Sequence, residues 1–90
     1  MVIAALKVKI LPDSPEANLE EIMNKSKEIS ERFGCKSFKS EEEDIGFGLK
    51  ALIITLAWPE EQQQELLEEE LRKIEHVDSA EVIDFRRAIG

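Results

Sequence analysis

The chain has few residues of the types that carry out covalent chemistry, and their neighbours in the sequence favour structural roles. Cys35 is the only cysteine and His76 the only histidine among 90 residues, so no internal disulfide and no thiolate cluster for a metal can form. Only Lys36 adjoins Cys35 to stabilise a thiolate, which indicates a buried side chain and not a nucleophile. His76 stands at a predicted helix–strand junction, where an imidazolium would cap the helix. We therefore expect no catalytic residue.

The acidic run at residues 41–44 is the other candidate for chemistry, because carboxylates are the ligands of hard metal ions. Consecutive side chains of an extended segment point to alternate sides, so these four carboxylates would not converge on one ion. A solvated strand at the edge of a sheet is the simpler interpretation. The sequence therefore predicts no metal site and no cofactor.

Phe47 is the residue whose surroundings most favour binding. A large ring normally belongs in a core, but this one stands between Gly46 and Gly48, where the chain must turn and neither neighbour has a side chain to cover it. The pattern predicts a ring that is presented to a partner. The alternative is a ring that folds back over its own sheet.

Two adjacent arginines near the end of the chain are the second feature that points to binding. Arg86 and Arg87 form a cationic pair in a chain with a formal net charge of -8. An exposed ring and a cationic pair favour docking onto a protein over turnover of a substrate. The residues that we expect to contact a partner are Gly46, Phe47, Gly48, Lys50, Arg86 and Arg87.

Composition limits the size of the molecule and the nature of its partners. Ninety residues make a single domain with one core. With 20 acidic against 12 basic side chains, its field repels phosphodiesters and anionic lipids, so we expect no direct binding of nucleic acid or membrane. The apolar stretch at residues 2–11 is interrupted by Lys7 and Lys9 and is therefore neither a signal peptide nor a membrane span. We expect a cytoplasmic protein.

Hydrophobic periodicity predicts six elements that would position these residues. Strands are expected at residues 2–11, 35–43, 49–58 and 77–87. Asn18 with Glu21 has the form of a capping box and begins a helix that ends at Gly34, and Pro59 is expected to open a second helix at its first position. The order βαββαβ predicts an α+β fold, a ferredoxin-like sandwich with a four-stranded antiparallel sheet and both helices on one face.

The last predicted strand changes phase, which affects the open face of the sheet. Its apolar residues occupy both parities, so it contains a bulge or shows apolar side chains on both sides. If apolar residues of the other strands also face outward, the open face carries an apolar patch of the kind that binds proteins. Alternatively, the stems of Lys7, Lys9 and Glu81 shield it.

Several functions of ferredoxin-like domains lack the residues that they need. The first and third predicted strands contain no aromatic residue on which a base could stack before Trp58, which weighs against RNA recognition. Residues 11–17, after the first strand, contain no cysteine or histidine for copper or zinc carriage, and no arginine for a phosphate cradle. The fold alone therefore does not identify the function.

The chain resembles a known family in its turn, its second helix and its last strand. Residues 46–50 (Gly-Phe-Gly-Leu-Lys) lead into a strand rich in leucine and isoleucine, an acidic helix follows, and residues 76–79 (His-Val-Asp-Ser) precede a strand that ends in Arg86 and Arg87. In this order the chain resembles the archaeal translation elongation factor 1-beta family, and it is similar to the C-terminal exchange domain of the eukaryotic proteins of that name. The resemblance covers essentially all 90 residues. It implies a ferredoxin-like fold and a single domain over residues 1–90 that exchanges guanine nucleotide on elongation factor 1-alpha, the GTPase that delivers aminoacyl-tRNA.

The resemblance also implies roles for two residues. In the eukaryotic domains the ring of the glycine-flanked turn enters a pocket of the GTPase's nucleotide domain, and Phe47 matches it. A lysine next to their C-terminus reaches toward the Mg²⁺ and terminal-phosphate site, and Arg87 takes that position, with residues 88–90 extending past it. Arginine is larger and forked, so it suits an acidic or phosphate group better than the place of an ion. We expect docking of Phe47 and Arg87 together to deform that site and release GDP, as a regulator and not an enzyme.

Two other functions remain open at this point. A small-ligand sensor like the ACT domains has the same element order, but these domains use a glycine after the first strand, and residues 11–15 contain none. A structural module would pair its open sheet face with another copy, whereas an exchange factor is expected to be a monomer when free.

Overall fold

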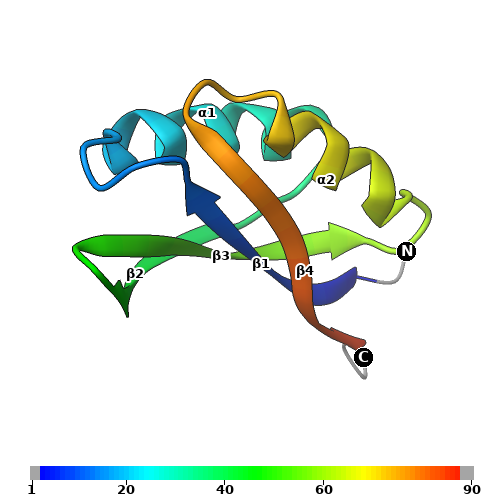
Figure 1. Cartoon of the computed structure of the whole chain (residues 1–90). Helices are drawn as coiled ribbons and strands as arrows, with labels where there is room; N and C mark the ends of the chain where they lie inside the picture. The colour runs from blue at the N-terminus through cyan, green and yellow to red at the C-terminus, as the bar shows by residue number, and fades with distance from the viewer. Residues whose placement is uncertain (1–2, 88–90) are drawn as a thin grey trace.

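Six elements follow one another in the predicted order in the computed structural model, which describes residues 3–87 (Figure 1). They are β1 (Ile3–Pro12), α1 (Leu19–Arg32), β2 (Phe38–Gly46), β3 (Leu49–Pro59), α2 (Gln64–Arg72) and β4 (Val77–Arg87). The strands form one antiparallel sheet in the order β2-β3-β1-β4, and both helices cover the same face of it. The predicted ferredoxin-like α+β fold is therefore confirmed.

The core lies between the sheet and the helices. One face of β1 and β3 supplies its apolar side chains, and α2 adds Leu67 and Leu71, both fully buried. The Trp58 ring is also fully buried, and its centroid lies 5.6 Å from that of Phe33. Its Nε1–H donates to the carbonyl of Gln62 at 3.2 Å, which ties the turn after β3 to the core.

The two helices begin differently. The Asn18 side-chain oxygen accepts from the backbone N–H groups of Glu20 and Glu21 at 3.0 and 3.3 Å, so the predicted cap of α1 is confirmed. The prediction that Pro59 opens α2 is wrong. Pro59 ends β3, where it pairs with Ile3, and α2 begins at Gln64 after a turn. The pairing with β1 extends the strand to the position where the helix was expected.

Of the two alternatives expected for β4, the structure shows the bulge. Lys7 pairs with Asp84 and Val8 with Val82, so Ile83 has no partner on β1. The backbone N–H of Val82 donates to the carboxylate of Glu68 on α2 at 2.8 Å. This contact fixes the bulge to the helix layer, and the rest of β4 continues toward its end from there.

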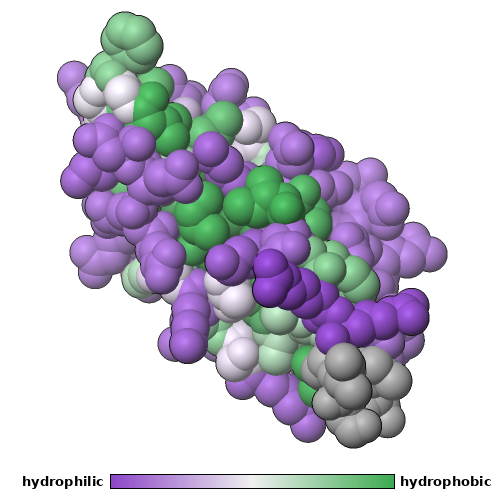
Figure 2. All heavy atoms as spheres, turned by 90° about the horizontal axis from the view of Figure 1, so that it is seen from below, coloured by the Kyte–Doolittle hydropathy of each residue, from purple (hydrophilic) through white to green (hydrophobic). Residues whose placement is uncertain are grey.

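The open face of the sheet is partly shielded. Ala51 and Ile53 point to this face, yet both are buried. Lys9 and Glu41 flank Ile53 in the register, and the Lys9 ammonium lies 4.0 Å from the Glu43 carboxylate. Figure 2 shows a narrow hydrophobic strip on a mostly hydrophilic face. The side-chain stems therefore cover Ala51 and Ile53 and narrow the predicted apolar patch to the strip that remains visible in Figure 2.

Candidate functional site

The turn at residues 46–48 has an unusual backbone. Gly46, Phe47 and Gly48 have φ angles of 93°, 56° and 76°, all in the left-handed region. Glycine adopts this region freely, whereas a residue with a side chain does so at a cost of about 1–3 kcal/mol. The carboxylate of Asp44 accepts from the N–H of Gly46 at 3.1 Å and supports the start of the turn. Two glycines therefore enclose one strained residue at the tip of the β2–β3 hairpin.

Phe47 projects fully into solvent from this tip. Its relative exposure is 99%, so the ring contacts almost nothing in its own chain. The alternative in which the ring folds back over the sheet is wrong, and the predicted outward position is confirmed. Backbone strain at a fully exposed aromatic residue has no benefit for packing, and such strain is most often found where a protein binds something else.

Lys50 lies on β3 just after the turn. Its ammonium is 3.6 Å from the carboxylate of Glu42 on β2, and both side chains are about half exposed. Gly48 and Lys50 also line a hollow of about 410 Å³ between the hairpin and the loop that follows β1. Sequence patterns gave no signal of this hollow, because the turn and the loop are about thirty residues apart and meet only in the folded chain.

Arg86 and Arg87 occupy the end of β4 and point to opposite sides of the sheet. Arg86 pairs with Ala5 on the open face, and Arg87 pairs with Ala4 on the helix side. The Arg86 guanidinium lies 3.2 Å from the carboxylate of Asp84, and that of Arg87 contacts Glu60. The Glu60 side chain is only 19% exposed, and the contact is an ion pair without the alignment of a hydrogen bond. Residues 88–90 lie outside the described part of the chain.

The phenylalanine and the arginine pair lie at opposite ends of the sheet. The turn precedes Leu49 at one end of β3, whereas Arg87 and Trp58 both pair with Ala4 at the other end. Nine residues of strand separate these points, which is about 30 Å at roughly 3.3 Å per residue, in a molecule whose longest dimension is 41 Å. Figure 1 shows the hairpin tip and the C-terminal end of β4 on opposite sides. The expectation that Phe47 and Arg87 deform one phosphate and Mg²⁺ site by touching it together is therefore wrong.

His76 does not cap α2. The helix ends at Arg72, and His76 follows four residues later with a φ of 71°. Its carbonyl accepts from the N–H of Asp13 at 2.9 Å, and its Nδ1 lies 3.4 Å from the Asp13 carboxylate. The residue joins the loop before β4 to the end of β1. Its role is structural, as predicted, but the predicted cap is wrong.

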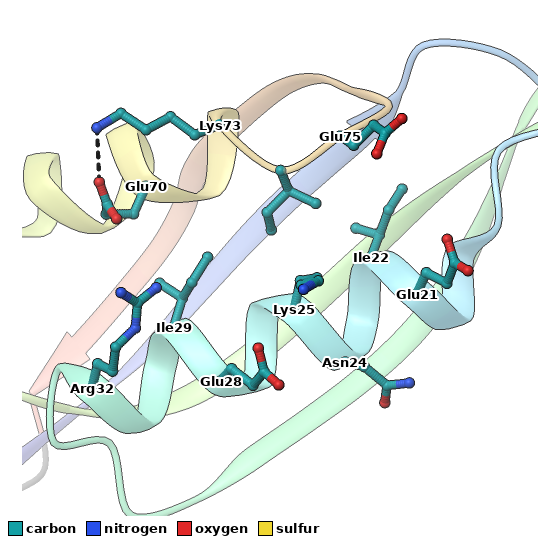
Figure 3. A pocket seen from close by; sticks show the side chains of 11 residues that line it. Glu21, Ile22, Asn24, Lys25, Glu28, Ile29, Arg32, Glu70, Lys73 and Glu75 are labelled. Carbon is teal, nitrogen blue, oxygen red and sulfur yellow. Dashed lines mark hydrogen bonds and ion pairs between the residues drawn. The ribbon is translucent and has the colours of Figure 1, made fainter.

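Another hollow lies between the helices and contains none of the predicted site residues. It has a volume of about 710 Å³, and it is lined by side chains of α1, by Glu70 of α2 and by the residues that follow α2 (Figure 3). Ile22 and Ile29 lie toward its base, and the rim carries both signs of charge, including the ion pair of Lys73 with Glu70 at 3.0 Å. Within residues 3–87, no group of three or more histidine, cysteine or acidic side chains could hold a metal ion. No helix in that range is long and apolar enough to cross a membrane.

Cys35 is half-buried, and this burial raises the pKa of its thiol to about 11. The thiolate is the reactive form, so alkylation by iodoacetamide should be slow at pH 8 and should rise about tenfold per pH unit up to pH 10. In urea the burial is lost, and the rate should level off near pH 9. The measurement is the loss of free thiol with time, followed by mass. A plateau below pH 9 in the folded protein would contradict the structural role of Cys35.

Comparison with known proteins gives one consistent match. The sequence pattern of the EF-1 guanine nucleotide exchange domain matches residues 5–88. Elongation factor 1-beta of Thermococcus gammatolerans is 42% identical over 78 residues, which cover 83% of this chain and 84% of that protein. Elongation factor 1-beta of Methanothermobacter thermautotrophicus is 41% identical over 83 residues, covering 89% and 90%. The protein of that name from Nanoarchaeum equitans is 35% identical over 82 residues, covering 90% of this chain and 100% of its own length.

Proposed function

Because this chain belongs to the EF-1 guanine nucleotide exchange domain family, we propose that it promotes release of GDP from the elongation factor 1-alpha GTPase by docking near the phosphate and Mg²⁺ site of that protein. The docking proposal rests on the exposure of Phe47, whose side chain is 99% exposed in a strained turn. A ring in this position has no role in its own core, whereas buried aromatic anchors supply much of the energy of protein interfaces.

The two ends of the molecule have different roles in this proposal. Phe47 is the anchor, which fills an apolar pocket of the GTPase and holds the complex together. Arg87, about 30 Å away along the strand direction, reaches the phosphate and Mg²⁺ site and weakens its hold on GDP. The contact surface then runs along the length of the molecule, whose longest dimension is 41 Å. Exchange depends on both ends, because binding of Phe47 positions Arg87 at the phosphate and Mg²⁺ site.

The energy required is within the range of a few such contacts. Faster release by a factor of about 1000 requires the barrier to GDP release to fall by roughly 4 kcal/mol. A few interface residues commonly supply about 2–4 kcal/mol each. Linkage makes the effect on affinity reciprocal, so whatever factor this chain takes from the affinity of the GTPase for GDP, bound GDP takes from the affinity of the GTPase for this chain. In this proposal the chain acts as a regulator, and no covalent step takes place.

The proposal is tested by the release of a fluorescent GDP analogue from elongation factor 1-alpha. Release should be faster by about 1000-fold at saturating concentrations of this chain, an acceleration of roughly 4 kcal/mol. The experiment is repeated over a range of free Mg²⁺, because an action at the Mg²⁺ site should be largest when the ion is abundant. A protein of the same size and net charge serves as the control. Unchanged release at every Mg²⁺ concentration would refute the exchange function.

A further inference from the structure

A groove runs from the Phe47 turn between α1 and the outer strand β2. It consists of two hollows, of about 410 and 270 Å³, which share Leu19, Glu20 and Glu42 in their linings. Gly48 lines the first hollow, and Met23 of α1 with Ser40 of β2 line the second. We call it the α1–β2 groove. The groove begins beside the Phe47 turn, because Gly48 lines it.

The base of the α1–β2 groove is apolar. Leu52 is buried in the core, and Leu19 and Met23 are half-buried against it. The Ser40 hydroxyl lies 3.1 Å from the sulfur of Met23, so its donor is already used within the groove lining. The base therefore offers hydrocarbon contact to a long side chain and few sites for its hydrogen bonds.

The rim of the groove is acidic. Glu20 of α1 and Glu42 of β2 line both hollows, and Glu41 lines the second. Lys50, in the first hollow, is the one cation among the described lining residues, and it already pairs with Glu42 at 3.6 Å. The second hollow thus combines an apolar base with carboxylates that exceed the cations nearby. A lysine or arginine side chain fits this arrangement, since its stem packs on hydrocarbon while its head meets carboxylates.

We propose that the α1–β2 groove receives a lysine or arginine side chain of the same GTPase that takes Phe47. This inference rests on the proposed function. Two observations favour a protein over a free cation as the occupant. Gly48 belongs both to the turn and to the groove lining, so a partner that covers Phe47 lies over the groove entrance. The chain also has a formal net charge of -8, which favours a basic surface on whatever binds it.

The test measures the affinity of elongation factor 1-alpha for full-length variants by calorimetry. Glu20→Gln and Glu42→Gln should each raise the Kd by about 3- to 10-fold, and the double variant Glu20→Lys, Glu42→Lys by about 100-fold, as expected for charged contacts at an interface. Glu69→Gln is the matched control, because it makes the same change of net charge on the exposed side of α2. It should change the Kd by less than about twofold.

The same experiment includes a salt series, which tests for ionic contacts, and a check that each variant is folded. The difference between wild type and the glutamine variants should shrink between about 0.05 and 0.5 M salt, because ionic contacts are screened. Thermal midpoints verify that each variant is folded. If Glu20→Gln and Glu42→Gln bind like Glu69→Gln, or if their defect is the same at every salt concentration, the groove proposal is wrong. In that case the exchange function still stands if Phe47→Ala weakens binding. Both proposals fail if the wild-type chain does not speed the release of GDP from the GTPase.

Discussion

Phe47→Ala is expected to raise the Kd for elongation factor 1-alpha by about 100-fold, as loss of a central aromatic anchor does in other interfaces. The rate of GDP release at a low, fixed concentration of this chain should fall in proportion. At saturating concentration much of the rate should return, because the arginine end of the molecule is unchanged. The measurement is the dependence of the GDP release rate on the concentration of the variant. A defect that persists at saturation would contradict the role of Phe47 as an anchor.

The stability of the fold should not depend on the Phe47 ring. The side chain is almost completely exposed, so Phe47→Ala should leave the thermal midpoint nearly unchanged. Phe47→Gly should raise the free energy of unfolding by up to about 1 kcal/mol, because glycine adopts the φ of 56° without strain. Leu66→Ala is the matched control, since Leu66 is a partly exposed apolar residue on α2 and should retain full affinity. A large loss of stability in Phe47→Ala would show that the ring packs against its own chain.

The hairpin tip could be predicted from the sequence because its signal is local. Two glycines around one aromatic residue specify a tight turn that no side chain can cover. The cap of α1 by Asn18 and the bulge in β4 depend in the same way on neighbouring residues or on the parity of one strand. These three features, each specified within one short segment, are present in the structure.

Predictions that needed the relation between segments were less successful. Pro59 suits the first turn of a helix, but pairing with Ile3 keeps it in β3, and local propensity does not contain this long-range contact. The α1–β2 groove has no sequence signal for the same reason, since Leu19 and Glu42 meet only after the sheet forms. The contact of Glu68 with the Val82 backbone likewise joins a helix to a strand across the fold.

The separation of Phe47 from Arg87 follows from topology, although sequence analysis expected the two to act at one place. β3 and β4 are both antiparallel to β1, so they run in the same direction. A residue before the start of β3 and a residue at the end of β4 must then lie at opposite ends of the sheet. One contact region for both would require one strand to be reversed. Docking at two separate points therefore follows from the strand directions of the βαββαβ fold and does not depend on how the side chains are placed.

Arg87→Ala is expected to slow GDP release at saturating concentration by about 100-fold, corresponding to roughly 3 kcal/mol, while the Kd for the GTPase changes by less than about threefold. In the proposed mechanism the guanidinium acts on the phosphate and Mg²⁺ site, and Phe47 supplies the affinity. The measurement is the maximal GDP release rate with the Kd determined separately. Lys27→Ala removes one positive charge from the exposed side of α1 and should alter neither quantity.

Three further variants test how the arginine end acts. Arg87→Lys keeps the charge as a compact ammonium and should retain most of the release rate if charge near the phosphates is what matters, whereas a requirement for the planar fork would make it as slow as Arg87→Ala. Arg86 points to the other face of the sheet, so Arg86→Ala shows which face meets the nucleotide site. Because Arg87 leaves Glu60 when it reaches the GTPase, Glu60→Gln should speed docking slightly by weakening the competing ion pair. If Arg87→Ala binds more weakly but releases GDP at the wild-type maximal rate, the division of roles between the two ends is reversed.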